Sequence, residues 1–181
     1  QGYKDDTEDP AVTVRFRVKN SPQEFLLAWT TTPWTLPGNM ALAVGREVNY
    51  VRAELNGETL ILAKDRLSAV APEAKVVEEM TGERLLGLEY EPLYTFAKLG
   101  DKKAHYVVAA PFVSTADGTG LVHIAPMYGE DDYQVGLDNN LPQVHTVTPR
   151  GEMSPEVTPW AGQFVKKADA GVMADLESRG L

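Results

Sequence analysis

The clearest structural signal in this chain is the segment Asn49-Tyr50-Val51-Arg52-Ala53-Glu54-Leu55-Asn56-Gly57-Glu58-Thr59-Leu60-Ile61-Leu62-Ala63. Its central Asn-Gly pair supplies the two positive φ angles of a type I′ turn, so the residues on either side predict the two strands of a hairpin. Upstream, apolar and polar residues alternate over 12–18, and this period of two predicts a half-buried strand. The chain is therefore expected to be rich in strands from its beginning.

Working outward from the hairpin, the same patterns predict further short elements. The additional strands are expected at 25–30, 41–44, 75–78, 105–110, 120–125 and 143–147. Helices are expected at 64–70, 131–138 and 169–179. Twelve prolines and fifteen glycines separate these elements at short intervals. Many short strands with frequent turns favour a mainly β fold, and we expect a closed β-barrel core decorated by short helices rather than a parallel α/β sheet.

Composition limits the class of protein. A chain of 181 residues fits one domain, because a domain of this size buries roughly 70% of its unfolded surface. The absence of cysteine excludes disulfides, thiolate catalysis and cysteine-based zinc sites. A net charge of −9 argues against a protein that grips nucleic acid mainly through phosphates, but is compatible with binding one nucleotide end. No apolar run approaches a membrane span and no leader opens the chain, so we expect a soluble, cytoplasmic protein.

A polar corner follows the predicted strand 25–30, in the sequence Trp29-Thr30-Thr31-Thr32-Pro33-Trp34-Thr35-Leu36-Pro37-Gly38-Asn39. Three consecutive hydroxyls end the strand, and Pro33 cannot continue it as a central strand. Such a corner can orient a ligand. Taken alone, the threonines are more typical of an edge strand whose hydroxyls bond the local backbone.

A second polar pattern lies downstream, in Asp117-Gly118-Thr119-Gly120-Leu121-Val122-His123-Ile124-Ala125-Pro126 and the following Met127-Tyr128-Gly129-Glu130-Asp131-Asp132-Tyr133-Gln134. It predicts a glycine turn, a short buried strand that carries His123, a loop and an acidic helix start. Carboxylates in a first helical turn interact favourably with the helix dipole, and a single buried histidine is commonly a hydrogen-bonded core residue. Neither feature requires a function by itself.

The two patterns together resemble the editing domain inserted in the class I isoleucyl-tRNA synthetases. A third segment, Gly82-Glu83-Arg84-Leu85-Leu86-Gly87-Leu88-Glu89-Tyr90-Glu91-Pro92-Leu93, resembles a Gly-x-x-Leu-x-Gly-x-x-Tyr-x-Pro-Leu stretch shared with the valyl and leucyl relatives. Those relatives typically carry Thr-Thr-Arg-Pro followed by an acidic residue, so Thr32 and Trp34 favour the isoleucyl type. Met127-Tyr128 departs from the small-residue-plus-Phe pair expected before Gly129.

The resemblance implies a single editing domain over 1–181, excised from a larger synthetase, with 1–10 and 175–181 as connecting segments. An isoleucine site rejects valine poorly, because one methylene is worth only about 1 to 3 kcal/mol, and these enzymes are themselves the standard example of that limit. A second pocket that admits valine and excludes isoleucine corrects the error by hydrolysis. The implied substrate is the valine ester at the 3′ end of isoleucine tRNA, with valyl-adenylate as a second candidate.

The resemblance also implies roles for individual residues. Asp132 would bind the ammonium group of the aminoacyl moiety through a charge-assisted bond. Thr30, Thr31 and Thr32 would surround the aminoacyl and ribose groups, and together with Asp132 they form the expected catalytic set. The expected substrate-binding set is His123, Asn39, Trp34 and Gly120, with His123 near the amino-acid side chain and Asn39 near the nucleotide. Packing explains Trp34 at least as well as a base contact.

No residue pattern indicates a nucleophile, since Ser114 and Ser154 lack an evident His and Asp partner. We therefore expect an oriented water to attack the ester. No His-x-Gly-His or Lys-Met-Ser-Lys-Ser signature is present, so this chain should neither bind ATP nor charge tRNA. We expect it to need no cofactor, with ATP and any Mg or Zn belonging to other domains, and to work as a monomer beside the rest of the parent synthetase, without a membrane.

Three alternatives remain open at this stage. The chain could be the editing domain of a valyl or leucyl relative. It could be a module that binds the tRNA 3′ end without catalysis. It could also be a metal-dependent hydrolase that uses His123, Glu130 and Asp132, although no second histidine stands at a zinc-like spacing.

Overall fold

The computed structural model describes residues 12–30, 33–94, 104–113, 115, 118–125, 130–139, 141, 146, 152–153, 160–163 and 165–179. Its strands are β1 (Val12–Arg17), β2 (Glu24–Thr30), β3 (Ala41–Val44), β4 (Asn49–Leu55), β5 (Glu58–Ala63), β6 (Lys75–Thr81), β7 (Tyr106–Ala109) and β8 (Val122–Ile124). The α-helices are α1 (Leu67–Val70), α2 (Glu130–Asp138) and α3 (Val165–Ser178), and the 3-10 helices are η2 (Pro33–Gly38), η3 (Lys64–Arg66) and η4 (Gly82–Leu85). None of the helices in these ranges has the length and apolar character that a membrane crossing requires.

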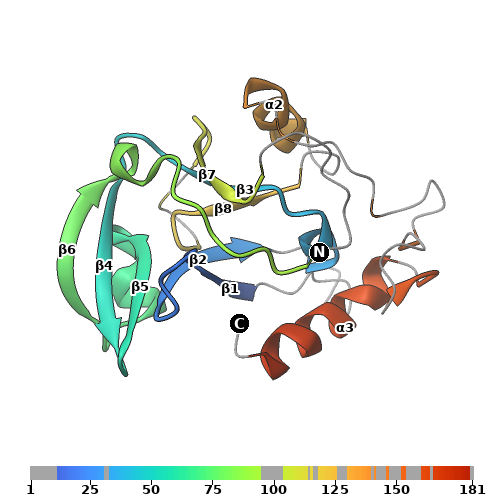
Figure 1. Ribbon diagram of the computed structural model, residues 1–181, viewed down its shortest axis with the longest axis horizontal. Helices are drawn as coiled ribbons and strands as arrows, with labels where there is room; N and C mark the ends of the chain where they lie inside the picture. The colour runs from blue at the N-terminus through green and yellow to red at the C-terminus, as the bar shows by residue number, and fades with distance from the viewer. Residues whose placement is uncertain are drawn as a thin grey trace, which may run out of the picture.

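Strand β2 is the centre of the sheet. One of its edges pairs with β1 along its whole length, from Val12 opposite Thr30 to Arg17 opposite Phe25. Its other edge is shared: β5 pairs with residues 24–26, and β8 meets Trp29 through Val122. Figure 1 shows the result, with β4, β5 and β6 curling at one end of the molecule and α2 and α3 lying toward the other.

The expected closed barrel is not what the described strands form. Their order is β6-β4-β5-β2-β8-β3-β7, with β1 added beside β2, so β6 and β7 are the ends of an open, curled half-barrel. Strand β6 has the features of a protected edge: its register against β4 shifts at a bulge between Arg52 and Ala53, and most of its residues are exposed. Bulges and charged residues are common devices that stop an edge from pairing further.

Most of the elements predicted from local pattern are confirmed. The hairpin turn has the positive φ angles expected of Asn56 and Gly57, at 52° and 82°. The strand predicted at 75–78 extends to Thr81, and the one predicted at 120–125 is shorter. The helix predicted at 169–179 is confirmed, although it begins four residues earlier, at Val165, and ends at Ser178. The strand predicted at 143–147 lies outside the described residues, apart from Thr146.

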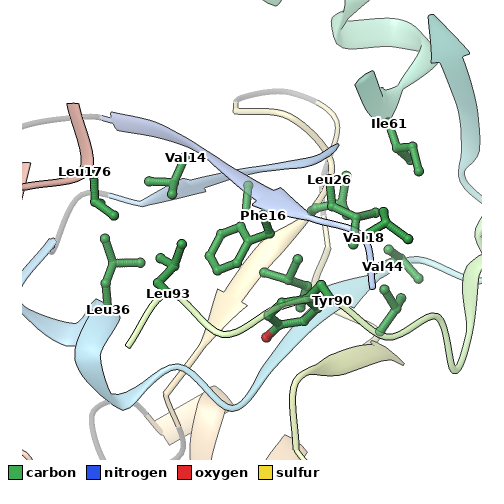
Figure 2. Packing of buried hydrophobic residues seen from close by; sticks show 14 of the residues in the cluster. Val14, Phe16, Val18, Leu26, Leu36, Val44, Ile61, Tyr90, Leu93 and Leu176 are labelled. Carbon is green, nitrogen blue, oxygen red and sulfur yellow. The ribbon is translucent and has the colours of Figure 1, made fainter. Parts of the chain in front are cut away.

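The main core lies between β1, β2, β3 and the helices η2 and α3. Phe16 is fully buried, and the ring of Tyr90 meets it edge-on at a centroid distance of 5.2 Å. Figure 2 shows this pair among Leu36, Leu93 and Leu176, which come from three different parts of the chain. Burying a side chain such as Phe16 contributes about 1.5 to 3 kcal/mol, so this cluster attaches α3 and η2 firmly to the sheet.

Gly120 occupies a backbone position that only glycine fills easily. Its φ is +84°, and a Cβ atom there would collide with the Cβ of Ala63. Its carbonyl also accepts a hydrogen bond from the Tyr50 hydroxyl. The turn before β8 is therefore seated directly against the hairpin of β4 and β5.

Replacement of Gly120 by alanine should lower the free energy of unfolding by more than a positive φ alone explains. Gly87→Ala is the matched control, because Gly87 has a φ of +85° and open space where a Cβ would lie. We expect Gly120→Ala to cost about 1 to 3 kcal/mol more than Gly87→Ala, since overpacking adds to the backbone strain. Urea unfolding of the two variants measures the difference, and equal losses would contradict the close approach.

Candidate functional site

Three of the residues singled out from the sequence meet where β2 ends. Because β8 runs parallel to β2 with Val122 opposite Trp29, Thr30 lies level with His123. Strand β3 pairs with the other edge of β8, with Leu42 opposite His123, and Asn39 lies two residues before the start of β3. All three side chains are buried, with 4% to 7% of their surface exposed. The sheet thus gathers Thr30, Asn39 and His123 from distant parts of the sequence.

Both ring nitrogens of His123 are hydrogen-bonded inside the protein. Its Nε2 lies 2.8 Å from the hydroxyl of Thr35, which is carried by η2. Its Nδ1 lies 2.7 Å from the side-chain nitrogen of Asn39. Thr35 was not among the residues predicted for the site. It lies within the segment 29–39, but apart from being polar it had no feature that indicated a contact with His123.

The partners of Asn39 determine which nitrogen of His123 carries the proton. The Asn39 Nδ2 also donates to the carbonyl of Ala41 at 2.9 Å, and a carbonyl oxygen can only accept. The amide nitrogen therefore faces both Ala41 and His123, so Nδ1 of His123 accepts and its Nε2–H donates to Thr35. The histidine is neutral in this arrangement, and burial lowers its pKa from 6.5 to about 3.

The remaining polar atom of Asn39 is bonded as well. Its Oδ1 accepts a hydrogen bond from the hydroxyl of Tyr90, which is buried in the main core. Burial raises the pKa of Tyr90 well above its usual value, so the hydroxyl stays protonated. The four side chains of Tyr90, Asn39, His123 and Thr35 therefore form one continuous hydrogen-bonded row.

Asp132 approaches the site from the first turn of α2. Its Oδ2 accepts a hydrogen bond from the backbone N–H of Ala125 at 3.0 Å, and Ala125 directly follows β8. The carboxylate is partly exposed, unlike His123. The bond places a negative charge at the same end of β8 that carries the neutral histidine.

Trp34 is the second residue of η2, and its ring packs against the main core, where it is partly buried. Its backbone N–H donates to Oδ1 of Asp169 at 2.9 Å. Asp169 is a buried carboxylate on α3, and it satisfies a backbone donor that the start of a helix leaves open. Sequence reasoning missed Asp169, because its partner is 135 residues away and nothing local marks the contact.

Several predicted positions lie outside the described part of the chain. These are Thr31, Thr32, Ser114, residues 126–129, Ser154 and the side chain of Glu130. The metal alternative requires that Glu130 side chain; within the described residues, no three histidine, aspartate or glutamate side chains cluster in a way that could hold a metal ion. A surface cleft of about 1110 Å³ lies near Gly45 and Ala110, beyond the opposite end of β3 from Asn39, and no predicted site residue lines it.

Because burial lowers the pKa of His123, the contribution of this residue to the free energy of unfolding depends on pH. The unfolded chain takes up a proton near pH 6.5, whereas the folded protein keeps His123 neutral down to about pH 3. The contribution is therefore complete above pH 6.5 and is lost as the pH falls toward 3. His123→Gln removes this titration, so the stability gap between wild type and variant should narrow by up to about 1.4 kcal/mol per pH unit below 6.5.

Urea unfolding of both proteins at several values between pH 7.5 and pH 4.5, a window set by the unfolded pKa of histidine, measures this gap. His105, whose pKa burial also lowers, titrates in both proteins and cancels in the comparison. A gap that is constant across this range would show that His123 is not held neutral by the fold.

Known proteins with sequences similar to this chain include isoleucine–tRNA ligases. An isoleucine–tRNA ligase of Clostridium acetobutylicum is 51% identical over 180 residues, which cover 99% of this chain and 17% of that relative. The enzyme of Bdellovibrio bacteriovorus is 43% identical, over 99% of this chain and 18% of the relative. The chain thus spans about a sixth of the length of these curated relatives. No protein-family model matches it.

Solved structures with the same fold come from leucyl-tRNA synthetases. The crystal structure of GlLeuRS-CP1 matches with a TM-score of 0.75 over 94% of this chain and 96% of its own, at 15% identity. The editing domain of the P. falciparum cytosolic leucyl-tRNA synthetase matches with a TM-score of 0.62 over 92% of this chain and 97% of its own, at 10% identity. At these identities the likeness concerns the fold alone. The chain is therefore homologous over nearly its whole length to one section of the isoleucine–tRNA ligases, and it has the fold of the leucyl-tRNA synthetase editing domains.

Proposed function

We propose that this chain is the proofreading domain of an isoleucine–tRNA ligase and hydrolyses the ester of valine with isoleucine tRNA. Valyl-adenylate is a second candidate substrate. Two findings support the proposal: the sequence relatives are isoleucine enzymes, and the fold is that of editing domains. The identity of those relatives favours the isoleucine enzyme over its valyl and leucyl counterparts.

The observation that carries the proposal is the bond between Asp132 and Ala125. It holds a carboxylate beside the end of β8, close in the chain to the buried, neutral His123. An aminoacyl ester carries an ammonium group and an alkyl side chain on the same carbon. A site for it therefore needs an anion next to an uncharged wall, and charge-assisted bonds are the strong ones that fix orientation.

Hydrolysis then needs only an oriented water. The water oxygen attacks the ester carbonyl carbon, the bond from that carbon to the ribose oxygen breaks, and the ribose oxygen takes a proton, so the products are valine and free tRNA. We assign the ordering of this water to the threonines Thr30, Thr31 and Thr32 together with the neighbouring free ribose hydroxyl. Asp132 anchors the substrate and does not act as the base. The expected binding roles of Asn39, Trp34 and Gly120 gain no support from their described contacts: the Asn39 amide bonds Ala41, His123 and Tyr90, the Trp34 ring packs on the main core, and Gly120 lies against Ala63.

The partners follow from the same proposal. The domain would act beside the rest of a larger synthetase, which supplies the contacts to tRNA phosphates that an acidic chain with a net charge of −9 supplies poorly. It would receive the aminoacylated 3′ end of the tRNA, as a monomer in the cytoplasm. It would need no cofactor of its own.

Asp132 provides a sharp test, because two substitutions separate its charge from its hydrogen bond. Asp132→Asn retains an oxygen for the N–H of Ala125 but has no charge, and we expect it to lower valyl-tRNA deacylation by about tenfold or more, as expected for losing a bond to a charged group. Asp132→Ala removes both and should be at least as inactive. The measurement is the loss of valine from valyl-tRNA(Ile), with the full synthetase as enzyme and this domain as the site of substitution.

Asp138→Asn is the matched control, since Asp138 lies on the same helix, is exposed and bonds only Gln134 among the contacts described. It should deacylate like the wild type. Full activity of Asp132→Ala would refute the ammonium role. A wild-type enzyme that binds valyl-tRNA(Ile) without hydrolysing it would instead support the alternative of a binding module.

Removal of metal ions distinguishes the proposed mechanism from the metal alternative. Because the attacking water is oriented by protein and ribose groups, deacylation of preformed valyl-tRNA(Ile) should survive exhaustive chelation unchanged. Loss of activity on chelation, restored by a divalent ion, would favour the metal site built from His123, Glu130 and Asp132. The assay starts from the preformed ester so that any metal requirement of aminoacylation does not enter.

A further inference from the structure

We propose that Tyr90 is a positioning residue of this site, which acts through Asn39 to fix the tautomer and the orientation of His123. The link to His123 stands on the structure alone. Its consequence for substrate selection rests on the proposed function.

The backbone of Tyr90 is held on both sides. It forms an isolated bridge with Val18, and its N–H donates to the carbonyl of His105 at 3.1 Å. The residue is 2% exposed, and its ring contacts the rings of Phe16 and His105 edge-on. In Figure 2 the hydroxyl oxygen of Tyr90 lies at the border of the apolar group that the figure shows. A rigid, buried tyrosine thus presents one polar atom from the core.

That atom determines how Asn39 is oriented. An asparagine amide can be turned around, which exchanges its oxygen and nitrogen. Here Tyr90 donates to Oδ1 and the Ala41 carbonyl accepts from Nδ2, so both contacts favour the same orientation. Removal of the Tyr90 hydroxyl leaves Oδ1 as a buried acceptor without that donor, a costly state that the amide or its neighbours would shift to relieve.

The orientation of Asn39 passes on to His123. With Nδ2 facing Nδ1, the histidine accepts at Nδ1 and donates at Nε2 to Thr35. All bonds in the row then run in one direction, from Tyr90 to Thr35, and such chains strengthen one another. The ring is held at both nitrogens and remains neutral. Tyr90 is the only member of this row that lies in the quoted segment 82–93, far from the other site motifs.

A fixed neutral ring matters for a pocket that must distinguish valine from isoleucine. One methylene gives roughly 10- to 200-fold discrimination in a well-formed pocket, and a wall that can move loses part of this. Tyr90 would therefore set the selectivity of the site without touching the substrate. Its removal should affect the choice between esters more than the hydrolysis of the valine ester itself.

The test compares Tyr90→Phe with Tyr94→Phe. The control also loses one tyrosine hydroxyl, which bonds Asp175 on α3, away from the row. Nitrogen-15 spectra of the His123 ring are expected to show unprotonated Nδ1 and protonated Nε2 in the wild type and in Tyr94→Phe. In Tyr90→Phe the Nδ1 signal should shift toward the protonated value. The ratio of valyl- to isoleucyl-tRNA(Ile) hydrolysis should fall by about tenfold, the size expected for one lost hydrogen bond.

A folded Tyr90→Phe protein with an unchanged His123 ring would overturn the inference, and so would a changed ring with unchanged selectivity. Asn39→Asp gives a second readout that does not depend on Tyr90→Phe folding: a carboxylate oxygen facing Nδ1 should draw the proton to Nδ1 and raise the pKa of His123 by at least about one unit. An unchanged pKa would contradict the coupling. If the wild-type enzyme hydrolyses neither ester, the proposed function fails, and the spectra alone decide the link from Tyr90 to His123.

Discussion

The seating of the turn at residues 118–120 is the constraint on which the rest of the site depends. Strand β8 is short and meets β2 at one residue pair, so its place beside β2 is set mostly by the turn that precedes it. Three side-chain hydrogen bonds tie that turn to separate elements. Arg66 donates to the carbonyl of Gly118, the hydroxyl of Thr119 to that of Leu27, and the hydroxyl of Tyr50 to that of Gly120. His123 lies on β8, three residues after this turn. The bonds that hold the turn therefore also determine where the histidine side chain lies in the site.

The polar row that follows is compatible with burial because each of its links is satisfied. Burying an unpaired polar group costs roughly 1 to 3 kcal/mol, and burying an unpaired charge costs far more. Four neutral side chains that bond one another avoid both costs, and a protonated His123 would break the match at Nδ1. The low pKa of His123 and the geometry of Asn39 are thus two expressions of the same arrangement. The charged groups, Asp132 and Asp169, are bonded to backbone N–H groups next to the row.

Local sequence patterns correctly predicted the elements whose structure depends on residues close together in the chain. The hairpin around Asn56 and Gly57 and the alternating strand at β1 are of this kind, and both are confirmed. The described strands form an open half-barrel in place of the expected closed barrel. The sharing of one edge of β2 between β5 and β8 depends on contacts distant in sequence, which alternation does not encode. Thr30, Asn39 and His123 were found through a family resemblance, and the sheet brings them together. Thr35, Tyr90 and Asp169 were missed, since each acts through a partner that no short pattern indicates.

The placement of β8 beside the first turn of α2 explains how one short region can serve two chemical demands of the proposed substrate. His123 points from the strand into a dry, neutral environment, whereas Asp132 lies on the helix and retains partial exposure. A carboxylate inside the dry part would tend to hold a proton or raise the pKa of the histidine. Separating the two by the strand end, and joining them through Ala125, keeps the charge available for an ammonium group while the adjoining wall stays uncharged. In an α-amino ester the ammonium group and the alkyl side chain are attached to the same carbon. The distance between the end of β8 and the first turn of α2 is therefore the dimension that any substrate of this site has to match.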